Sequence, residues 1–314
     1  MQMKDETMKK VFIDGSAGTT GLRIRERLAD RQDITLLTLP EGLRKDAAAR
    51  REKLNEADVV FLCLPDDAAR EAVGMIENER TAVIDTSTAH RTAEGWTYGF
   101  AELGYREAIA TSRRIANPGC HASGFLALVT PLVKEGLIAP DTALSAFSLT
   151  GYSGGGKKMI AEYEADELDP LLAAPRQYAL GQSHKHLPEM TKIAGLTVAP
   201  VFCPIVGNFY SGMEVTVPLF AKDLKGSAED IKAVYAGWYG KGLVRYAEQT
   251  DESGFLSAAA YEGRDDMEIC VHGNAERILL TARFDNLGKG ASGAAIQNMN
   301  ILLGQDEVRG LVLA

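Results

Sequence analysis

A short apolar strand, followed at once by a glycine loop and a helix, constrains the fold more than any other feature of this chain. Residues 9–14 read KKVFID, GSAGTTG follows, and LRIRERLAD then places apolar residues at helical spacing. Gly15, Gly18 and Gly21 form a G-x-x-G-x-x-G pattern in the loop. Glycines let the backbone approach a pyrophosphate, and a helix N-terminus favours negative charge. The pattern predicts dinucleotide binding more strongly than a turn that is glycine-rich only for packing.

The type of dinucleotide depends on the residues around this loop. Ser16, Thr19 and Thr20 add hydroxyl groups to the predicted cofactor loop. An acid near the end of the second strand is typical of NAD binding, and Glu41 lies there. Arg44 and Lys45 follow it and could hold the 2′-phosphate of NADP instead. A solvated loop with none of these roles is the third interpretation.

Strands and helices continue to alternate over the first hundred residues. DITLLTL, ADVVFLCLP and TAVIDTS predict three more strands, and PDDAAREAVGMI predicts a helix. ADVVFLCLP is apolar throughout, as expected of a parallel strand covered on both faces. We therefore predict a Rossmann-type doubly wound α/β sheet over residues 1–119.

The pattern changes beyond residue 120. Longer and more alternating strand candidates follow, namely TALSAFSLTG, GLTVAPVFCPIVG, GMEVTVPLFA, MEICVHGN and RILLTARFDN. Helical signals occur in SAEDIKAVYAGWYG and around MIAEYEADEL. Mixed strands with helices on one face predict a second, α+β domain over residues 120–285.

Charge and hydropathy argue against some classes of partner. The net charge of −9 argues against nucleic acid or an anionic membrane as the main partner, whereas a small anionic substrate needs only a few local cations. No apolar run is long enough to cross a bilayer. The opening MQMKDETMKK lacks the apolar core of a secretory signal, so we expect a disordered extension, with Met8 as an alternative start.

The four cysteines indicate a reducing compartment. Cys63, Cys120, Cys203 and Cys270 are far apart and form no C-x-x-C pair. A disulfide framework or a metal site is therefore not expected, and a cytoplasmic location fits better.

Cys120 stands apart from the other three cysteines. It follows an Asn-Pro-Gly turn in IANPGCHASG and precedes the apolar stretch FLALVTPLVKEGL, at a predicted helix start. A helix N-terminus lowers the pKa of a thiol, because backbone N–H groups favour the anion. Cys120 is therefore either a nucleophile or a small apolar residue.

A second glycine-rich loop is compatible with a different function, that of a phosphotransferase. Residues 151–158 read GYSGGGKK, which is G-x-x-x-x-G-K with Lys158 where a P-loop needs Ser or Thr. A phosphotransferase is one interpretation. The others are a loop over Ser153–Lys157 that offers N–H groups and a cation to an anionic substrate, and a plain glycine turn.

Histidines cluster at YALGQSHKHLPE, residues 178–189. His184 and His186 are two apart, and a metal pair would need further ligands that the neighbouring sequence does not supply. A cysteine with a distant histidine can instead form a nucleophile–base pair. His184 is the predicted acid/base, and His121, beside Cys120, is its main competitor.

These segments together resemble one enzyme family. NPGC, SGGGKK, the Tyr178/His184/His186/Glu189 constellation and KGASGAAIQNMNILLG occur in the order found in N-acetyl-γ-glutamyl-phosphate reductases, chiefly their shorter type. VIDTSTAHR and YGFAEL add to the likeness, which runs from about Met8 to the C-terminus. The loop GSAGTTG departs from the commoner G-A-S-G-Y-T-G form, since Thr19 replaces an aromatic residue. The chain is more remotely similar to aspartate-semialdehyde and glyceraldehyde-phosphate dehydrogenases.

The resemblance implies a function and a set of site residues. The implied reaction is NADPH-dependent reduction of an acyl phosphate to N-acetylglutamate semialdehyde in arginine biosynthesis, through a thioester on Cys120 with His184 as acid/base. A glyceraldehyde-phosphate dehydrogenase-like catalytic domain, a homo-oligomer (dimer or tetramer) and a helix in residues 286–314 that returns to the cofactor domain, with Asn298 near the cofactor, are also implied. The implied substrate-binding residues are Arg91, where the family has an arginine near the substrate phosphate, and Asn117, Ser153, Gly154 and Lys157. Tyr178, His186 and Glu189 are implied to bind substrate or to support His184. Besides this reductase and the phosphotransferase, a non-enzymatic NAD(P)-sensing module remains a third interpretation.

Overall fold

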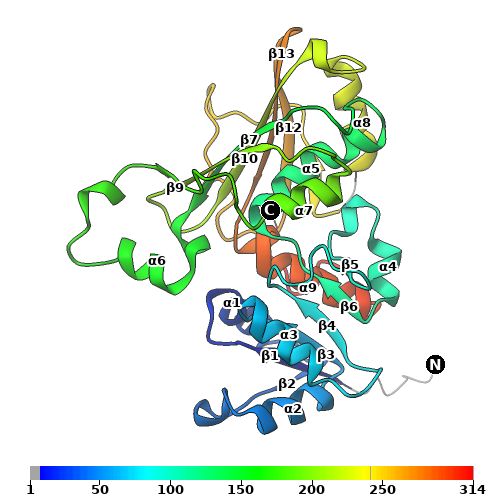
Figure 1. Cartoon of the computed structure of the whole chain (residues 1–314), viewed down its shortest axis with the longest axis vertical. Coiled ribbons are helices and arrows are strands. Elements are labelled where there is room, and N and C mark those ends of the chain that lie inside the picture. Colours follow the sequence, from blue (N-terminus) through cyan, green and yellow to red (C-terminus); the bar gives the residue numbers. More distant parts are fainter. Residues whose placement is uncertain (1–7, 241, 314) are drawn as a thin grey trace.

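The computed structural model describes residues 8–240 and 242–313. Two lobes, each built on one sheet, lie one above the other, and the last helix, α9 (Gly293–Leu302), lies between them (Figure 1). The expected disordered extension, residues 1–7, lies outside the described residues. None of the described helices has the length and apolar character that crossing a bilayer requires.

The first sheet is parallel throughout and has the strand order β2-β1-β3-β4-β6-β5. Chain order changes direction at β1, so the loop after β1 begins at the switch point where dinucleotides bind in such sheets. This arrangement confirms the predicted Rossmann-type sheet. Its strands are β1 (Lys9–Asp14), β2 (Ile34–Leu37), β3 (Val59–Leu62), β4 (Ala82–Asp85), β5 (Thr97–Tyr98) and β6 (Arg114–Ala116).

Helices cover both faces of this sheet, which explains its almost uninterrupted apolar strands. On β1, Val11 and Ile13 share one core with Ile296 of α9, whereas Phe12 packs in another with Leu54. The helices of this lobe are α1 (Thr19–Leu28), α2 (Ala47–Glu56), α3 (Asp66–Gly74) and α4 (Arg106–Thr111), with single 3-10 turns at Glu41–Leu43 and Ala101–Leu103.

The second sheet is mixed, with the order β11-β12-β13-β10-β7-β9-β8. β7 pairs in parallel with β9 and antiparallel with β10, and β10 pairs antiparallel with β13. The strands are β7 (Ser145–Gly151), β8 (Arg176–Gln177), β9 (Val201–Gly207), β10 (Met213–Phe220), β11 (Val244–Tyr246), β12 (Met267–Gly273) and β13 (Arg277–Phe284).

Helices pack on one face of this second sheet, as the alternating strands predict. The covering helices are α5 (Cys120–Lys134), α7 (Leu187–Ala194) and α8 (Ala228–Trp238), whereas α6 (Gly156–Tyr163) projects from one end (Figure 1). α5 packs very close to the sheet at Gly124, where an added Cβ would stand 2.5 Å from Cγ2 of Val215. This confirms the predicted α+β domain.

The sequence analysis missed the shortest strands. β5, β6, β8 and β11 have two or three residues each, too few to show a period. The run GLTVAPVFCPIVG, predicted as one strand, becomes extended only from Val201. The last segment forms a π-helical turn at Gly288–Ser292 and then α9. The boundaries 1–119, 120–285 and 286–314 stay predictions.

Candidate active site

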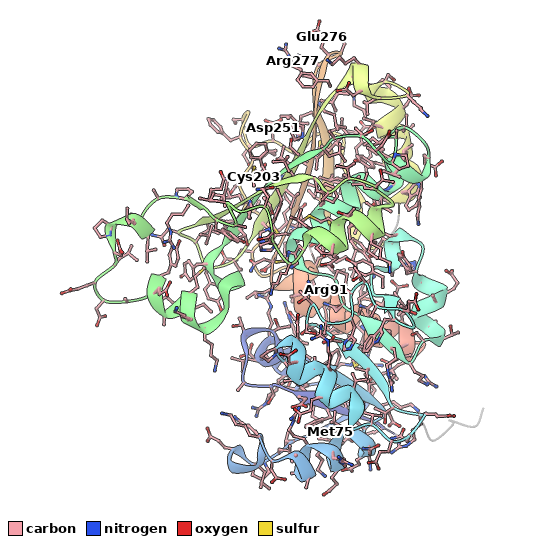
Figure 2. The ribbon with its side chains drawn as sticks, in the orientation of Figure 1. Met75, Arg91, Cys203, Asp251, Glu276 and Arg277 are labelled. Carbon is pink, nitrogen blue, oxygen red and sulfur yellow. The ribbon has the colours of Figure 1, made fainter. Side chains whose placement is uncertain are left out.

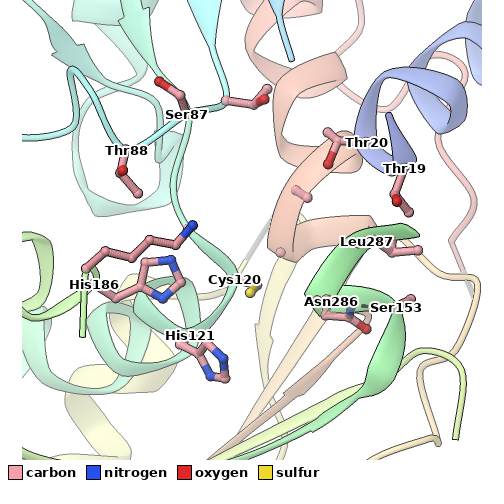
Figure 3. Close-up of a pocket in the computed structure, with 18 of the residues that line it drawn as sticks. Thr19, Thr20, Ser87, Thr88, Cys120, His121, Ser153, His186, Asn286 and Leu287 are labelled. Atoms are coloured by element: carbon pink, nitrogen blue, oxygen red, sulfur yellow. Dashed lines mark hydrogen bonds between the residues drawn. The ribbon is translucent and has the colours of Figure 1, made fainter. Parts of the chain in front are cut away.

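A cavity of about 550 Å³ lies where the two lobes meet, and Cys120 faces it. In Figure 3 the Cys120 side chain points into this space, with His121 and His186 on one side and Asn286 and Ser153 on the other. Thr19 and Thr20 of α1 lie across from the thiol. The glycine loop of the first lobe and the cysteine of the second therefore border one space.

The turn before Cys120 is fixed by a buried carboxylate. Gly119 N–H donates to Glu189 Oε1 at 2.9 Å, and the Tyr98 hydroxyl donates to the same oxygen at 2.6 Å. Arg91 Nη1 donates to Glu189 Oε2 at 3.1 Å. Glu189 thus joins α7, β5 and the Asn-Pro-Gly turn, and its contacts position the start of α5.

Gly119 is required for space rather than for an unusual conformation. Its φ is −82°, which any residue adopts. A Cβ there would stand 2.3 Å from Arg91 Nη1 and 2.4 Å from His186 Nε2. The glycine in NPGC therefore lets the arginine and the histidine pack against the turn.

The charge state of Cys120 differs from the sequence expectation. Burial raises the pKa of its thiol, although the nearby charges of Arg91 and Lys185 and the His121 backbone N–H act in the opposite direction. The N-terminus of α5 alone does not produce a thiolate, so the thiol needs a proton acceptor. Burial also raises the pKa of Cys63, to about 12.

His121 is held between two hydroxyl groups. Its Nδ1 lies 2.7 Å from Ser148 Oγ and its Nε2 lies 2.7 Å from the Tyr178 hydroxyl. Burial lowers the pKa of His121 to about 3, so the ring is neutral near pH 7. Both ring nitrogens of His121 are therefore engaged by hydroxyl groups.

His184 and His186 lie beside this pair, with ring centroids 4.8 Å apart. Burial lowers the pKa of His184 and, more strongly, that of His186. His184 is partly exposed on the cavity wall, and its Nδ1 accepts a long 3.3 Å hydrogen bond from the His186 backbone N–H. His184 is thus a neutral, partly exposed imidazole that lines the same cavity as the thiol.

The second glycine loop forms the opposite wall. Gly154, Gly155 and Gly156 line the cavity, and Asn286 Nδ2 donates to Ser153 Oγ at 3.0 Å. The Lys157 side chain is exposed and lies outside the lining. This placement suits a loop that offers backbone N–H groups to a substrate at Cys120.

Arg91 and Asn298 both bond Asn117, the first residue of the Asn-Pro-Gly turn. Figure 2 places Arg91 at the junction of the two lobes. Arg91 Nε donates to the Asn117 carbonyl at 3.0 Å. Asn298 Nδ2 donates to Asn117 Oδ1 at 3.1 Å and to the Gly99 carbonyl at 2.9 Å. Asn298 is fully buried, and its amide joins α9 to the Asn-Pro-Gly turn.

A second cavity, of about 750 Å³, lies on the other side of the first glycine loop. Arg44 and Lys45 line it together with Arg25. Gly15 has φ +89°, and a Cβ there would stand 2.2 Å from the Cys63 carbonyl oxygen. The close backbone, the helix N-terminus and the basic rim fit an extended dinucleotide with a 2′-phosphate.

The two cavities gather most of the predicted site residues. Cys120, His184, Arg91, Asn117, Ser153, Gly154, Tyr178, His186, Gly18, Thr19, Thr20 and Gly21 line the first, and Gly15, Ser16, Arg44 and Lys45 line the second. Lys157, Glu189 and Asn298 lie outside both. The individual roles of all these residues stay predictions.

Sequence reasoning missed several contributors, of which four are described here. Ser148, Tyr98, Asn286 and Lys185 contact site residues or line the first cavity. Lys185 had a signal, because it lies between His184 and His186. Ser148 lies in the middle of β7, Tyr98 ends β5 and Asn286 follows β13, and nothing local in the sequence distinguishes them.

Comparisons with known proteins agree with this geometry. The model described as "Semialdehyde dehydrogenase, NAD binding domain" matches residues 40–112, and "Semialdehyde dehydrogenase, dimerisation domain" matches residues 120–286. The N-acetyl-gamma-glutamyl-phosphate reductase of Chelativorans sp. is 47% identical over 94% of this chain and 98% of its own length. N-acetyl-gamma-glutamyl-phosphate reductase 2 of Nostoc sp. is 44% identical over 96% and 99%.

Solved structures share the fold at much lower identity. Aspartate semialdehyde dehydrogenase II of Vibrio cholerae, complexed with ASA, has a TM-score of 0.72 and 16% identity, covering 95% of this chain and 99% of that one. The Candida albicans aspartate semialdehyde dehydrogenase with NADP has a TM-score of 0.66 and 17% identity, with the same coverage. Because identities above 40% extend over nearly the whole chain, it belongs to the N-acetyl-gamma-glutamyl-phosphate reductase family of semialdehyde dehydrogenase-like proteins.

Proposed function

We propose that this protein catalyses the NADPH-dependent reduction of N-acetyl-γ-glutamyl phosphate to N-acetylglutamate semialdehyde, with release of phosphate, as a step of arginine biosynthesis. The observation that carries the proposal is Cys120 at a helix start, facing neutral imidazoles and bordering the same cavity as the dinucleotide loop. The full-length relatives named for this activity support it.

The chemistry begins with a proton transfer. Burial lowers the pKa of His184 and raises that of Cys120, so both groups start neutral, and His184 accepts the thiol proton as the sulfur attacks. The Cys120 thiolate attacks the acyl carbon, the bond from that carbon to the phosphate oxygen breaks, and phosphate leaves. The product is a thioester, which divides one difficult step into two easier ones.

The second half reduces the thioester. When bound, NADPH would supply the hydride that reduces the thioester carbonyl. His184, now protonated, donates a hydrogen bond to the carbonyl oxygen as negative charge develops there. The oxyanion then expels Cys120, which recovers its proton from His184, and the semialdehyde is released.

Two parts of the first lobe would hold the cofactor. The backbone from Gly15 to Gly21 and the N-terminus of α1 would bind the pyrophosphate, and Arg44 and Lys45 would bind the 2′-phosphate. Thr19 and Thr20 line the Cys120 cavity and would border the reactive end of the cofactor.

A homo-oligomer forms part of the proposal. The face of the second sheet opposite α5 exposes Phe147 (45%), Val201 (56%) and Leu279 (42%). The register of the paired strands places these three side chains on the same side of the sheet. An exposed apolar sheet face of this kind marks an association surface. Four free cysteines accord with the proposed cytoplasmic location.

Trapping the covalent intermediate tests the function. Protein mixed with the acyl phosphate without NADPH should show an acyl group on the peptide that contains Cys120, and NADPH should discharge it. Cys120→Ser should form no adduct and lose turnover, with Cys203→Ser as the matched control. Near-full turnover in Cys120→Ser would rule out the thioester route.

A further inference from the structure

Helix α1 begins at the first glycine loop and carries two arginines that contact the second lobe. Arg23 and Arg27 are four residues apart, so they lie on one face of the helix. Arg23 Nη2 lies 3.4 Å from Asp285 Oδ2, and Arg27 Nη2 lies 3.1 Å from Asp265 Oδ2. Arg27 Nη2 also donates to the Gly263 carbonyl at 3.0 Å. Two ion pairs therefore connect the helix of the cofactor loop to the other lobe.

The two acids lie at the same end of two paired strands in the second sheet. Asp265 precedes β12 and Asp285 follows β13, and these strands pair antiparallel. The two carboxylates are 1% and 0% exposed, whereas the side chains of Arg27 and Arg23 are 19% and 16% exposed. Burial raises the pKa of Asp265, although the charges of both arginines act in the opposite direction. The arginines thus supply positive charge to two carboxyl groups that are removed from water.

Asp285 also holds the turn that packs on the nucleophile. Its Oδ1 accepts the Leu287 N–H at 2.7 Å, immediately before the π-helical turn Gly288–Ser292. An added Cβ on Gly290 of this turn would stand 2.9 Å from the Cβ of Cys120. One buried carboxylate therefore joins α1 to the wall of the Cys120 cavity.

Reduction of the thioester is the step that depends on this connection. α1 begins at Thr19, which lines the Cys120 cavity, and the glycine loop before it would hold the cofactor pyrophosphate. Acylation of Cys120 involves the thiol, the imidazole and the substrate, whereas hydride transfer also needs the cofactor at a defined distance from the thioester. A misplacement of about 1 Å can cost about 10²-fold in rate.

We propose that Arg23 and Arg27 are positioning residues that fix α1, and with it the bound cofactor, relative to Cys120 through their ion pairs with Asp285 and Asp265. This inference rests on the proposed function. It assigns the two ion pairs to the reduction of the thioester and not to its formation.

Rapid-quench measurement of the two half-reactions tests this role. In Arg23→Met/Arg27→Met, Asp285 keeps the hydrogen bond from Ser211 Oγ at 3.0 Å and the one from the Leu287 N–H. Formation of the acyl adduct without NADPH should stay within about twofold of the unmodified rate, whereas discharge of the preformed adduct by saturating NADPH should slow about tenfold or more.

Two further variants control for charge and for stability. Arg23→Lys/Arg27→Lys keeps both charges and should give an intermediate discharge rate, and it carries the same test if the Met variant does not fold. Arg51→Met removes an exposed arginine of α2 that pairs with Glu77, and it should leave both half-reactions unchanged.

A second readout needs no acyl substrate. Because Thr19 and Thr20 line the Cys120 cavity, bound NADPH should slow the alkylation of Cys120 by iodoacetamide. In Arg23→Met/Arg27→Met, NADPH should bind with nearly unchanged affinity in a fluorescence titration but should protect the thiol less. The measured quantity is the ratio of alkylation rates with and without saturating NADPH, which removes any direct effect of the substitutions on thiol reactivity.

The outcomes separate this inference from the proposed function. An unchanged discharge rate, an equal slowing of both half-reactions, or NADPH protection that is absent from the unmodified protein or survives fully in the Met variant would overturn the positioning role. A weaker NADPH affinity with a normal discharge rate at saturation would overturn it as well. Absence of an acyl adduct in the unmodified protein would overturn the proposed function, while the alkylation experiment would still decide the role of Arg23 and Arg27.

Discussion

The protonation states of Cys120 and of three nearby histidines decide how these residues can react. Burial raises the pKa of the thiol and lowers the pKa values of His121, His184 and His186, so all four groups are neutral near pH 7. Neutral groups cost less to bury than an ion pair does. The ion pair then forms only as the thiol proton moves.

The pH profile of the reaction and two histidine substitutions test these protonation states and the assignment of His184. Because the pKa of His184 lies below its usual 6.5, the imidazole stays a base down to lower pH, and the acidic limb of kcat/KM should fall below pH 6.5. His184→Asn should lower kcat about 10²-fold or more, as expected for lost proton transfer, and should spare NADPH affinity. Greater damage from His121→Asn would reverse the assignment.

Cofactor preference is also set at the residue scale. Arg44→Ala should weaken NADPH binding more than NADH binding, because only NADPH carries the 2′-phosphate that this cation would hold. Fluorescence titration of both cofactors measures the difference. Arg51→Ala, an exposed arginine paired with Glu77, is the control. Equal losses for the two cofactors, or tighter NADH binding by the unmodified protein, would contradict the prediction.

At the scale of elements, α5 and α7 form one unit through the Glu189 carboxylate. α7 carries Glu189, which accepts the Gly119 N–H immediately before α5 and pairs with Arg91 from the first lobe. The carboxylate is 1% exposed, so its partners have no water to replace it. The direction in which α5 presents Cys120 therefore depends on this contact.

Glu189→Gln should be strongly destabilising, because it leaves the buried Arg91 charge without its partner. Removal of one member of a buried ion pair costs about 3–5 kcal/mol in free energy of unfolding. Thermal or urea unfolding measures this loss, and kcat should fall with it as the turn shifts. Glu162→Gln, on the exposed side of α6, is the matched control. A kcat and stability like those of the unmodified protein would show that the carboxylate does not position the turn.

At the scale of the whole molecule, the active site belongs to neither lobe alone. The first lobe supplies the glycine loop and Arg91, the second supplies Cys120 and the histidines, and α9 and the turn before it close the junction. A Cβ on Gly290 would stand 2.9 Å from the Cβ of Cys120, so this turn packs directly on the nucleophile. Relative placement of the lobes therefore sets the geometry of the reaction.

Association through the open sheet face is the prediction at this scale. Phe147→Glu places a charge in the centre of the exposed strands and should dissociate the oligomer, because a buried unpaired carboxylate disfavours the interface. Light scattering with size-exclusion chromatography gives the mass directly. Leu171→Glu, at a residue that is 72% exposed on a separate turn, should leave the mass unchanged. Dissociation by the control alone would place the interface elsewhere.

Local sequence suffices to predict the class of both sheets and to set Cys120 apart from the other cysteines. Strand KKVFID, the loop Gly15–Gly21 and the first helix are contiguous, so local periodicity and glycine spacing suffice to predict them. The turn NPGC before an apolar helix likewise lies within one short segment. Strands of two or three residues left no periodic signal, and they were missed for that reason.

Packing, by contrast, brings distant side chains together and sets their charge states. Glu189 contacts Gly119 and Arg91 across sequence separations of 70 and 98 residues, and no pattern in the chain specifies those pairs. Burial, not position at a helix start, controls the pKa of Cys120, because desolvation of a thiolate outweighs the helix N-terminus and the nearby cations. Sequence places the reactive groups along the chain, but packing fixes their solvation and their distances, and those set their chemistry.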